Sequence, residues 1–446
     1  MKSFLLFFLL TAFFSFSTSV DAQWVRQTNG LPSDWGIGWT IDASDSNNAL
    51  ISTSAGLFKT TDGGDSWINI FLPDTITETG IDVSISDESH FWIATELGKI
   101  IATTDAGENW SIQFDDESQT DFMNYIEMFD ESNGVAMGDA PFPFQNKPAV
   151  FLLTTDGGSS WVKSNDTTFI DVVSGDTWRR LDFTDLMHGY FYESGINPQK
   201  LFKTSDGGAS WIEANYNGSC TVLKCFNEEI ILLQSITCNP QCVGTIYKTT
   251  DGGGTWTESQ LGESWGNDFE FIPGDASKVF FTDYDNLYFS SDSGTTWGEI
   301  FVDTTELKLR DIVFTDSIHG WILGDDGKLF RTNNGGVLTG TDEIVYLPTE
   351  FSLSQNYPNP FNPTTIIQYQ VSNISHVTLK VYDILSREVA TLVNTEQSAG
   401  NYEVAFNVET LRATSLPSGV YFYRMQVNPV SGAGGFTETK KMVMLK

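Results

Sequence analysis

The chain has 446 residues, which exceeds the roughly 100–200 residues of one domain, so we expect at least two folded units. Aromatic residues make up 13% and charged residues 18%, with 39 glycines. This composition is typical of a β-rich globular protein and excludes a coiled coil, a collagen or a disordered tail. The 58 acidic and 24 basic residues give a formal net charge of −34, which disfavours nucleic-acid and anionic membrane partners because both are negative.

The N-terminus has the pattern of a secretory signal peptide over residues 1–22. Lys2 supplies a positive charge, residues 4–14 form an apolar run, and residues 20–22 fit a cleavage site. The run is shorter than the ~18 residues that a membrane span needs, so cleavage is favoured over a retained anchor. We expect a mature chain that begins at Gln23, has no transmembrane segment, and is secreted or displayed at the cell surface.

All four cysteines fall within residues 220–242, an even and clustered set that in an exported protein indicates disulfides. A zinc site is the alternative, but the spacings lack the paired C-x2-C pattern that such sites use. We therefore expect disulfides that stabilise one local hairpin region, with the pairing left open. The candidates are Cys220, Cys225, Cys238 and Cys242.

A turn motif recurs along the chain, first as residues 60–67 with the sequence TTDGGDSW. Its aspartates follow one another at steps of 43, 51, 50, 45 and 41 residues. A seventh, shorter copy at residues 332–336 lacks the tryptophan. The repeated aspartates and tryptophans are Asp62, Trp67, Asp105, Trp110, Asp156, Trp161, Asp206, Trp211, Asp251, Trp256, Asp292 and Trp297.

Each copy lies within a set of four predicted strands. Runs such as residues 81–95 and 311–324 alternate apolar and polar residues around a turn, which predicts two strands. The segments that flank the motif supply a third and a fourth strand. Four strands in about 45 residues are typical of a propeller blade, so the seven copies predict a seven-bladed β-propeller over residues 23–338.

We expect the motif residues to have a structural role. Gly63 and Gly64 allow the positive φ values of a tight turn, and the Asp62 carboxylate can accept backbone N–H bonds within it. The tryptophans are expected to pack between blades. Acid catalysis is excluded because symmetric copies around a ring do not converge on one point.

The chain also indicates how the ring closes. The seventh copy has no tryptophan strand after Gly336, whereas residues 23–28 read as such a strand without a preceding motif. We predict that this N-terminal segment completes the last blade by strand pairing.

The motif resembles the Asp-box, or BNR, repeat, whose pattern is Ser/Thr-x-Asp-x-Gly-x-Ser/Thr-Trp. Blade length and the Asp-x-x-His-Gly turn, as at residues 185–189, resemble propellers of photosystem II assembly factors and, more distantly, of sialidases, sortilin-type receptors and xyloglucan hydrolases. The resemblance implies the fold and leaves the activity open, because enzymes, receptors and assembly factors share it.

Composition changes near residue 350. Residues 351–446 carry 7 basic and 6 acidic side chains, a net charge of +1, whereas the preceding part carries 17 and 52, a net charge of −35. This break predicts a linker at residues 339–350 and a separate C-terminal domain. Strand-like runs predict a small Ig-like β-sandwich, so the fold class is all-β. The runs are residues 365–371, 377–382, 402–407, 420–427 and 441–445.

Three strings in this module carry a second resemblance: residues 356–363 (NYPNPFNP), 381–389 (VYDILSREV) and 416–421 (LPSGVY). Together they resemble the type A C-terminal sorting domain of the type IX secretion system, with Ser386 in place of the usual glycine. The resemblance implies export by the type IX machinery, removal of the module, and release or surface attachment. The alternative is an ordinary adhesive domain.

Ligand sites of propellers usually lie where the loops before the innermost strands meet around the channel. Aromatic residues with a few cations at this mouth suit a peptide or a carbohydrate, although the same residues can simply cap the channel. The candidate binding residues are Trp39, Tyr125, Phe142, Phe144, Trp178, Arg179, Arg180, Trp265 and Arg310.

No catalytic residue can be assigned from the sequence. A sialidase needs three arginines around one carboxylate, but Arg179 and Arg180 are adjacent and so point opposite ways on a strand. His90, His188 and His319 occupy equivalent turns and cannot share a metal. We expect no cofactor and no metal, and an enzymatic role is disfavoured without being settled.

The sequence thus predicts an exported, monomeric propeller that binds a protein or a glycan and is delivered by the type IX machinery through residues 351–446. A glycan-active hydrolase is the alternative, and a purely structural envelope protein is a third class. Opposed carboxylates at the channel mouth would favour the hydrolase.

Overall fold

The computed structural model describes residues 24–139, 149–163, 180–193, 199–238, 242–262, 264–300, 307–336, 345–346, 351–372, 375–397, 400–408, 416–429 and 435–445. These residues form strands and turns, with no α-helix among them. The described residues contain no helix that is long and apolar enough to cross a membrane. The predicted signal peptide and the binding candidates Phe142, Phe144, Trp178 and Arg179 lie outside the described residues.

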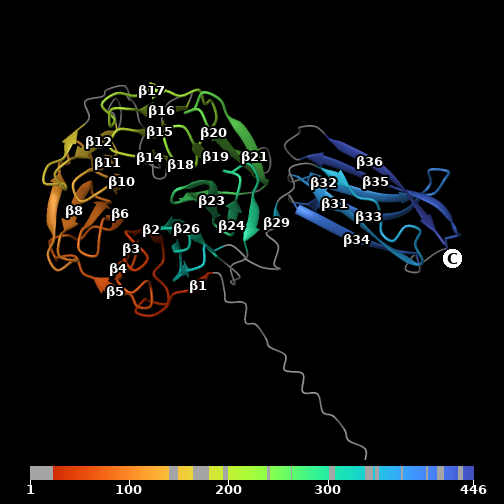
Figure 1. Cartoon of the computed structure of the whole chain (residues 1–446), viewed down its shortest axis with the longest axis horizontal. Helices are drawn as coiled ribbons and strands as arrows, with labels where there is room; N and C mark the ends of the chain where they lie inside the picture. Colours follow the sequence, from red (N-terminus) through yellow and green to blue (C-terminus); the bar gives the residue numbers. More distant parts are fainter. Residues whose placement is uncertain are drawn as a thin grey trace, which may run out of the picture.

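Seven antiparallel sheets of the described chain form a closed ring, which is the predicted propeller (Figure 1). Blades 1 to 7 follow the chain, and each begins with an innermost strand that faces the ring centre. These innermost strands are β2 (Gly38–Ala43), β6 (Gly80–Ile85), β10 (Met123–Met128), β14 (Leu181–Phe183), β18 (Val222–Cys225), β22 (Gly266–Ile272) and β26 (Leu309–Phe314).

The other strands of each blade follow outward from the centre. The second strands are β3 (Ala49–Thr53), β7 (Phe91–Thr95), β11 (Gly134–Gly138), β15 (Gly189–Glu193), β19 (Ile231–Cys238), β23 (Asp275–Asp283) and β27 (Gly320–Gly324). The third strands are β4 (Gly56–Thr60), β8 (Lys99–Thr103), β12 (Val150–Thr154), β16 (Lys200–Thr204), β20 (Cys242–Thr249), β24 (Leu287–Ser290) and β28 (Leu329–Thr332). The outer strands are β5 (Ile68–Ile70), β9 (Ser111–Asp115), β13 (Val162–Lys163), β17 (Ile212–Glu213), β21 (Thr257–Gly262), β25 (Gly298–Ile300) and, in blade 7, β1 (Val25–Arg26).

The repeated turn joins the third and the outer strand of a blade. In blade 1 the Asp62 carboxylate accepts the backbone N–H of Ser66 at 2.8 Å and the hydroxyls of Ser66 at 2.6 Å and Thr60 at 2.8 Å. Gly63 and Gly64 have φ values of 69° and 89°, which residues with a Cβ rarely adopt. The turn is thus closed by its own side chains.

The tryptophan that follows each turn packs between blades. Trp67, 3% exposed, lies in one cluster with Trp321 and Leu329 of blade 7. Burying the ~150–250 Å² of a tryptophan at about 25 cal/mol per Å² gives an upper estimate of ~4–6 kcal/mol. This exceeds the ~0.5–1.5 kcal/mol of one hydrogen bond, so the tryptophans are a major contact between the outer parts of neighbouring blades.

The ring closes through the N-terminus, as the sequence predicts. Val25 pairs with Arg331 and Arg26 with Phe330, so β1 is the outer strand of blade 7. The Trp24 indole donates a hydrogen bond to the Gly336 carbonyl at 3.1 Å. Trp24 therefore fills the position that Trp67 and its equivalents fill in the other blades.

The disulfide prediction is correct for one cysteine pair and wrong for the other. Cys238 and Cys242 form a disulfide between β19 and β20, whereas Cys220 and Cys225 are free and buried. Cys225 ends β18 and Cys220 precedes this strand. The strand residues Val222–Cys225 alone span about 10 Å, whereas bonded cysteines have Cα atoms ~4.4–6.8 Å apart.

The predicted linker at residues 339–350 contains a short strand. β29 (Val345–Tyr346) pairs with β25, with Gly298 opposite Tyr346 and Glu299 opposite Val345. Blade 6 therefore has a fifth strand on its outer edge. The linker is held to the propeller at this point.

The C-terminal module is a two-sheet sandwich, as predicted. One sheet has the order β30-β31-β34 and the other β33-β32-β35-β36, and their inner faces share one core. Strand β33 was not predicted because half of it is exposed and polar. The bounds are β30 (Ser352–Leu353), β31 (Thr364–Val371), β32 (Ser375–Tyr382), β33 (Glu388–Gln397), β34 (Gly400–Asn407), β35 (Gly419–Pro429) and β36 (Phe436–Met444).

Deletion of residues 23–28 should lower the melting temperature of the propeller by well over 5 °C. The deletion removes β1 and Trp24, so blade 7 loses its outer strand and the ring loses its closure. Calorimetry of the full chain and the deleted chain tests this. An unchanged melting temperature would contradict closure by strand pairing.

Candidate functional site: the central tunnel and its mouth

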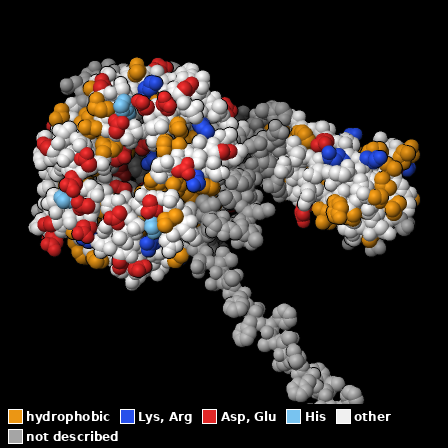
Figure 2. Space-filling model, viewed as in Figure 1, with side chains coloured by type: hydrophobic (Ala, Val, Ile, Leu, Met, Phe, Trp, Pro, Cys, Tyr) orange, Lys and Arg blue, Asp and Glu red, His pale blue; other side chains and the backbone are white. Residues whose placement is uncertain are grey.

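The innermost strands surround a central tunnel, a cavity of about 310 Å³ lined by residues of all seven blades. Figure 2 shows a hollow at the centre of the ring with acidic side chains around it. The polar residues that line it are Thr40, Asp42, Asp82, Ser84, Tyr125, Glu127, Asp182, Lys224, Asp268, Glu270 and Asp311. The lining therefore combines seven carboxylic acids with one lysine.

The tunnel carboxylates hold neighbouring blades together. An innermost strand has one sheet neighbour, so the N–H groups on its other edge have no partner within the blade. Asp311 of blade 7 accepts the N–H of Ile41 in blade 1 at 2.8 Å. Asp42 of blade 1 accepts the N–H of Ile85 in blade 2, also at 2.8 Å. We call these bonds from a side chain to the next blade's amide the clasp.

The same contact recurs around the ring. Asp82 accepts the N–H of Ile126 at 2.9 Å, and Asp182 accepts that of Cys225 at 2.7 Å. Between blades 6 and 7 two acids take part: Asp268 accepts the N–H of Ile312 at 3.3 Å and Glu270 that of Phe314 at 3.2 Å. Five of the seven blade interfaces are thus joined by carboxylates.

The two remaining interfaces use other groups. Between blades 3 and 4 the Tyr125 hydroxyl oxygen accepts the N–H of Phe183 at 3.4 Å and donates its own proton to Glu127. Between blades 5 and 6 the ammonium of Lys224 lies 3.3 Å from Glu270, and it lies 3.7 Å from Asp182 of blade 4. Lys224 replaces an acid at this position and neutralises two others.

Burial sets the protonation of the tunnel. Burial, together with the nearby Asp182 carboxylate, raises the pKa of Glu127 to about 8. Burial also raises the pKa of Glu270 to about 7, although Lys224 opposes this. Burial lowers the pKa of Lys224, but the carboxylates of Asp182 and Glu270 outweigh it, so that this pKa lies well above its usual value.

The tunnel is not arranged as a metal centre. No group of three or more His, Cys, Asp or Glu side chains within the described ranges is placed to hold a metal ion. The carboxylates are spread over different blades and are directed at backbone amides.

The structure brings three of the predicted mouth residues onto adjacent blades. Trp39 and Arg310 lie at register shifts of the innermost strands of blades 1 and 7, where a bulge re-aims the side chain. Trp265 lies just before the innermost strand of blade 6 and is 55% exposed. These residues belong to one arc of the ring.

Arg310 is held in place on this arc by Asp325 and Tyr284. Its guanidinium donates to Asp325 at 2.8 and 3.1 Å and lies 5.5 Å from the Tyr284 ring centre. Asp325 in turn accepts the N–H of Gly38 at 3.0 Å, which ties blade 7 to blade 1. The Arg310 side chain keeps 28% exposure. A fixed, partly exposed cation thus lies over the ring of Tyr284.

Two other predicted mouth residues lie elsewhere. Tyr125 lines the tunnel itself and takes part in the clasp. Arg180 belongs to blade 4, and its positive charge influences the Cys220 thiol. Burial raises the pKa of this thiol to about 12, and the Arg180 charge opposes the rise. Neither residue joins Trp39, Trp265 and Arg310 in one arc.

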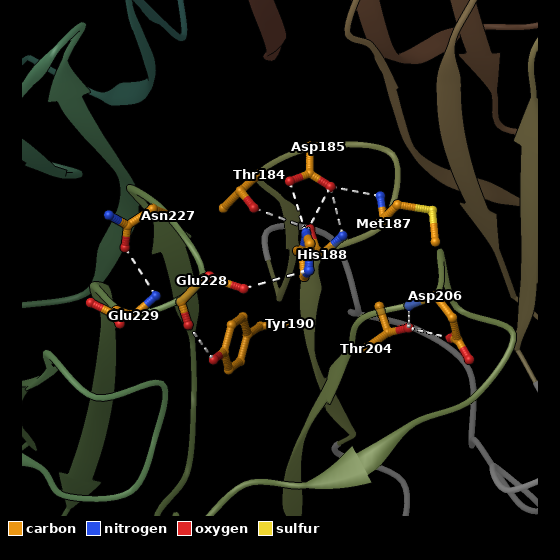
Figure 3. A network of polar contacts seen from close by, with 10 residues as sticks. All are labelled: Thr184, Asp185, Met187, His188, Tyr190, Thr204, Asp206, Asn227, Glu228 and Glu229. Carbon is orange, nitrogen blue, oxygen red and sulfur yellow. Dashed lines mark hydrogen bonds and ion pairs between the residues drawn. The ribbon is translucent and has the colours of Figure 1, made fainter.

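The three propeller histidines lie in turns between first and second strands, as the sequence predicts. His90, His188 and His319 each place Nδ1 2.7–2.9 Å from an aspartate three residues earlier. Figure 3 shows the turn of blade 4, where Asp185 also accepts the N–H groups of Met187 and His188. His188 Nε2 lies 3.5 Å from Glu228 of blade 5, so this turn also contacts the next blade.

Sequence reasoning missed the tunnel acids and the partners of Arg310. The sequence does contain a signal for these acids, because most first strands carry an acidic residue ahead of the turn to the second strand. Asp82, Asp182 and Asp311 are examples. Tyr284 and Asp325 follow second strands and carry no pattern that points to Arg310.

Comparisons with known proteins support the two-part architecture. Residues 355–443 match the family described as secretion system C-terminal sorting domain, as the sequence strings predict. This module indicates a secreted or outer-membrane-attached protein. A search of curated proteins finds no match.

Solved structures similar to this chain are propellers. A structure of YCF48 bound to D1 peptide is 18% identical with a TM-score of 0.55, covering 70% of this chain and 96% of its own. YCF48 from Cyanidioschyzon merolae is 17% identical with a TM-score of 0.57, covering 70% and 99%. The GH74 xyloglucanase from Xanthomonas campestris is 12% identical with a TM-score of 0.53, covering 94% and 74%. At these identities the likeness shows the fold alone.

The free energy of unfolding should fall as pH rises from about 5 to about 8. Between the ordinary carboxyl pKa and the raised values of about 8 for Glu127 and about 7 for Glu270, the folded protein binds more protons than the unfolded one. Raising the pH through this window therefore favours unfolding. Urea unfolding followed at several pH values measures the effect.

Glu127→Gln should flatten this pH dependence, because glutamine imitates the protonated side chain. The surface control is Glu258→Gln on the outer strand β21, which should leave the slope unchanged. A slope that is equally steep in Glu127→Gln would show that Glu127 does not titrate in the folded protein.

Proposed function

We propose that the propeller is an exported binding module whose ligand contacts the arc of the mouth formed by blades 6, 7 and 1. The observation that carries this proposal is Arg310, which is fixed by Asp325 and Tyr284 yet keeps part of its side chain exposed. Ordering a long side chain costs free energy on binding, and a pre-positioned arginine avoids much of this cost.

Trp265 and Trp39 extend this arc with aromatic surface. An exposed tryptophan and a fixed guanidinium on neighbouring blades suit a peptide, through stacking and hydrogen bonds to carbonyls or carboxylates. They also suit a sugar, which stacks on aromatic rings. The ligand class is therefore a protein segment or a glycan.

The structural neighbours support both ligand classes without deciding between them. YCF48 was solved with a D1 peptide, which makes peptide binding a reasonable use of a ring of this size. The GH74 neighbour is a xyloglucanase, which acts on a glycan. Both ligands are properties of those proteins.

A glycan-active hydrolase is the second candidate, and the raised pKa of Glu127 beside Asp182 favours it. A carboxylic acid protonated near neutral pH next to a second carboxylate is the pairing that glycosidases use. We rank it lower because Asp182 accepts the Cys225 amide and Glu127 accepts the Tyr125 hydroxyl proton. These groups are engaged in holding the blades.

We further propose a route to the cell exterior. Residues 1–22 direct the chain across the inner membrane and are removed, and the propeller spans residues 23–338. Residues 339–350 link it to the sorting domain at residues 351–446, which brings the chain to the type IX machinery. Release or display at the surface follows.

Glycan-array and pull-down binding with the full chain test the proposal. Trp265→Ala and Arg310→Lys should each weaken any binding found by at least about tenfold, since ~1.4 kcal/mol of contact is lost. Ile212→Ala is the matched control, because Ile212 is 61% exposed and lies on outer strand β17 of blade 4, outside the arc of blades 6, 7 and 1.

Retained affinity in Trp265→Ala and Arg310→Lys would assign the ligand to another face. Release of reducing sugar from a polysaccharide, lost in Glu127→Gln, would establish the hydrolase instead. Melting curves of each variant separate lost binding from lost folding.

A further inference from the structure

The three strings that identify the sorting domain converge at one end of the sandwich. Residues 356–363 are bound to the last strand, since Phe361 N–H donates to the Val443 carbonyl at 2.9 Å and Leu445 N–H to the Phe361 carbonyl at 3.0 Å. The string at 416–421 leads into β35, whose first residues Gly419 and Val420 pair with Met444 and Val443. Both strings therefore lie beside the C-terminal end of β36.

The third string reaches the same end. Tyr382, at the end of β32, pairs with Phe422 of β35, so the turn at residues 383–387 lies beside the start of that strand. Asp383 closes this turn by accepting the N–H of Leu385 at 2.9 Å and of Arg387 at 2.9 Å. Ser386 has a φ of 60°, which explains why the family usually has glycine there.

Exposed apolar side chains gather where the strings meet. Buried residues such as Phe361, Tyr421 and Met444 hold this end together from inside. The exposed set, which we call the sorting pole, comprises Tyr357 (81% exposed), Ile384 (75%), Leu385 (70%), Leu445 (51%) and Val420 (38%). Figure 1 marks the C-terminus at this end of the module. A cluster of large exposed apolar side chains on a soluble domain indicates an interaction site.

Charge indicates which kind of partner fits. Exposed Lys441 lies near the pole, and Arg387 at the pole is ion-paired with Asp383 at 2.7 Å. The module has a net charge of +1, whereas the rest of the chain has −35. A partner whose binding pocket is bordered by carboxylates is repelled by the acidic propeller but not by the sorting pole. A basic partner would instead be drawn to the whole propeller surface.

Resting on the export route proposed above, we propose that the sorting pole is the surface by which a protein of the export machinery takes up this chain, and that this protein has an apolar pocket with an acidic rim. Ile384 and Leu385 project from a rigid turn, so they enter such a pocket without ordering a flexible segment. Tyr357 and Leu445 extend the apolar contact, and Lys441 meets the rim.

Export of the full chain from a bacterium with a type IX secretion system tests the proposal. The variant Ile384→Ser with Leu385→Ser, and separately Tyr357→Ser, should reduce the ratio of external to periplasmic protein at least about tenfold. The control is Ile212→Ser with Val162→Ser on the propeller, where the two side chains are 61% and 65% exposed. The control should be exported like the unchanged chain.

A charge variant examines the second half of the proposal. Lys441→Glu should reduce export as well, because it places a carboxylate against the acidic rim. All variants change exposed residues, so melting curves of the purified proteins should match that of the unchanged chain.

Unchanged export of the pole variants, or equal loss in the control, would overturn the proposal. Unchanged export combined with loss of surface attachment would also overturn it, since the pole would then bind the envelope. Normal export of Lys441→Glu alone would overturn the acidic rim.

Discussion

The structure depends on one contact, the clasp in which a tunnel side chain accepts an amide of the next blade. A propeller blade has an inner edge with unpaired N–H groups, and the ring brings seven such edges together around a narrow space. Leaving a buried N–H without a partner costs about 1–3 kcal/mol, so each edge needs an acceptor from its neighbour. Asp42, Asp182 and Asp311 are such acceptors.

This contact has an electrostatic cost that limits what the tunnel can do. Seven acids share the space with Lys224, and burial raises the pKa of Glu127 and Glu270 towards neutrality. A proton held by Glu127 reduces the repulsion within the ring. The acids that resemble a catalytic pair therefore take part in the contacts that join the blades.

Much of the fold could be predicted because repetition makes weak signals additive. One turn of the type at residues 60–67 predicts a hairpin, but seven at nearly equal steps predict a ring. Even the closure by Trp24 could be predicted, because the last copy lacks its own tryptophan. The sorting domain was predicted from short strings that are specific to a family.

The site could be predicted only in part, because it depends on how blades meet. Trp39 and Arg310 were found from their place before an innermost strand, but their bulges and the partner Asp325 arise from pairing between strands. The prediction of a disulfide at Cys220 and Cys225 was wrong although the two cysteines are close in sequence, because the strand β18 extends from Val222 to Cys225. Tyr125 was placed at the mouth, whereas alternation directs it into the tunnel.

Hydrogen exchange of the innermost strands in Asp311→Ala, measured by mass spectrometry on the full chain, tests the clasp most directly. Asp311 accepts the Ile41 amide, so exchange of the peptide that contains β2 should accelerate at least about tenfold, while the peptide with Ile85, held by Asp42, keeps its protection. Unchanged exchange in β2 would contradict the account, because the Asp311 carboxylate would then not be what protects the inner edge of this strand.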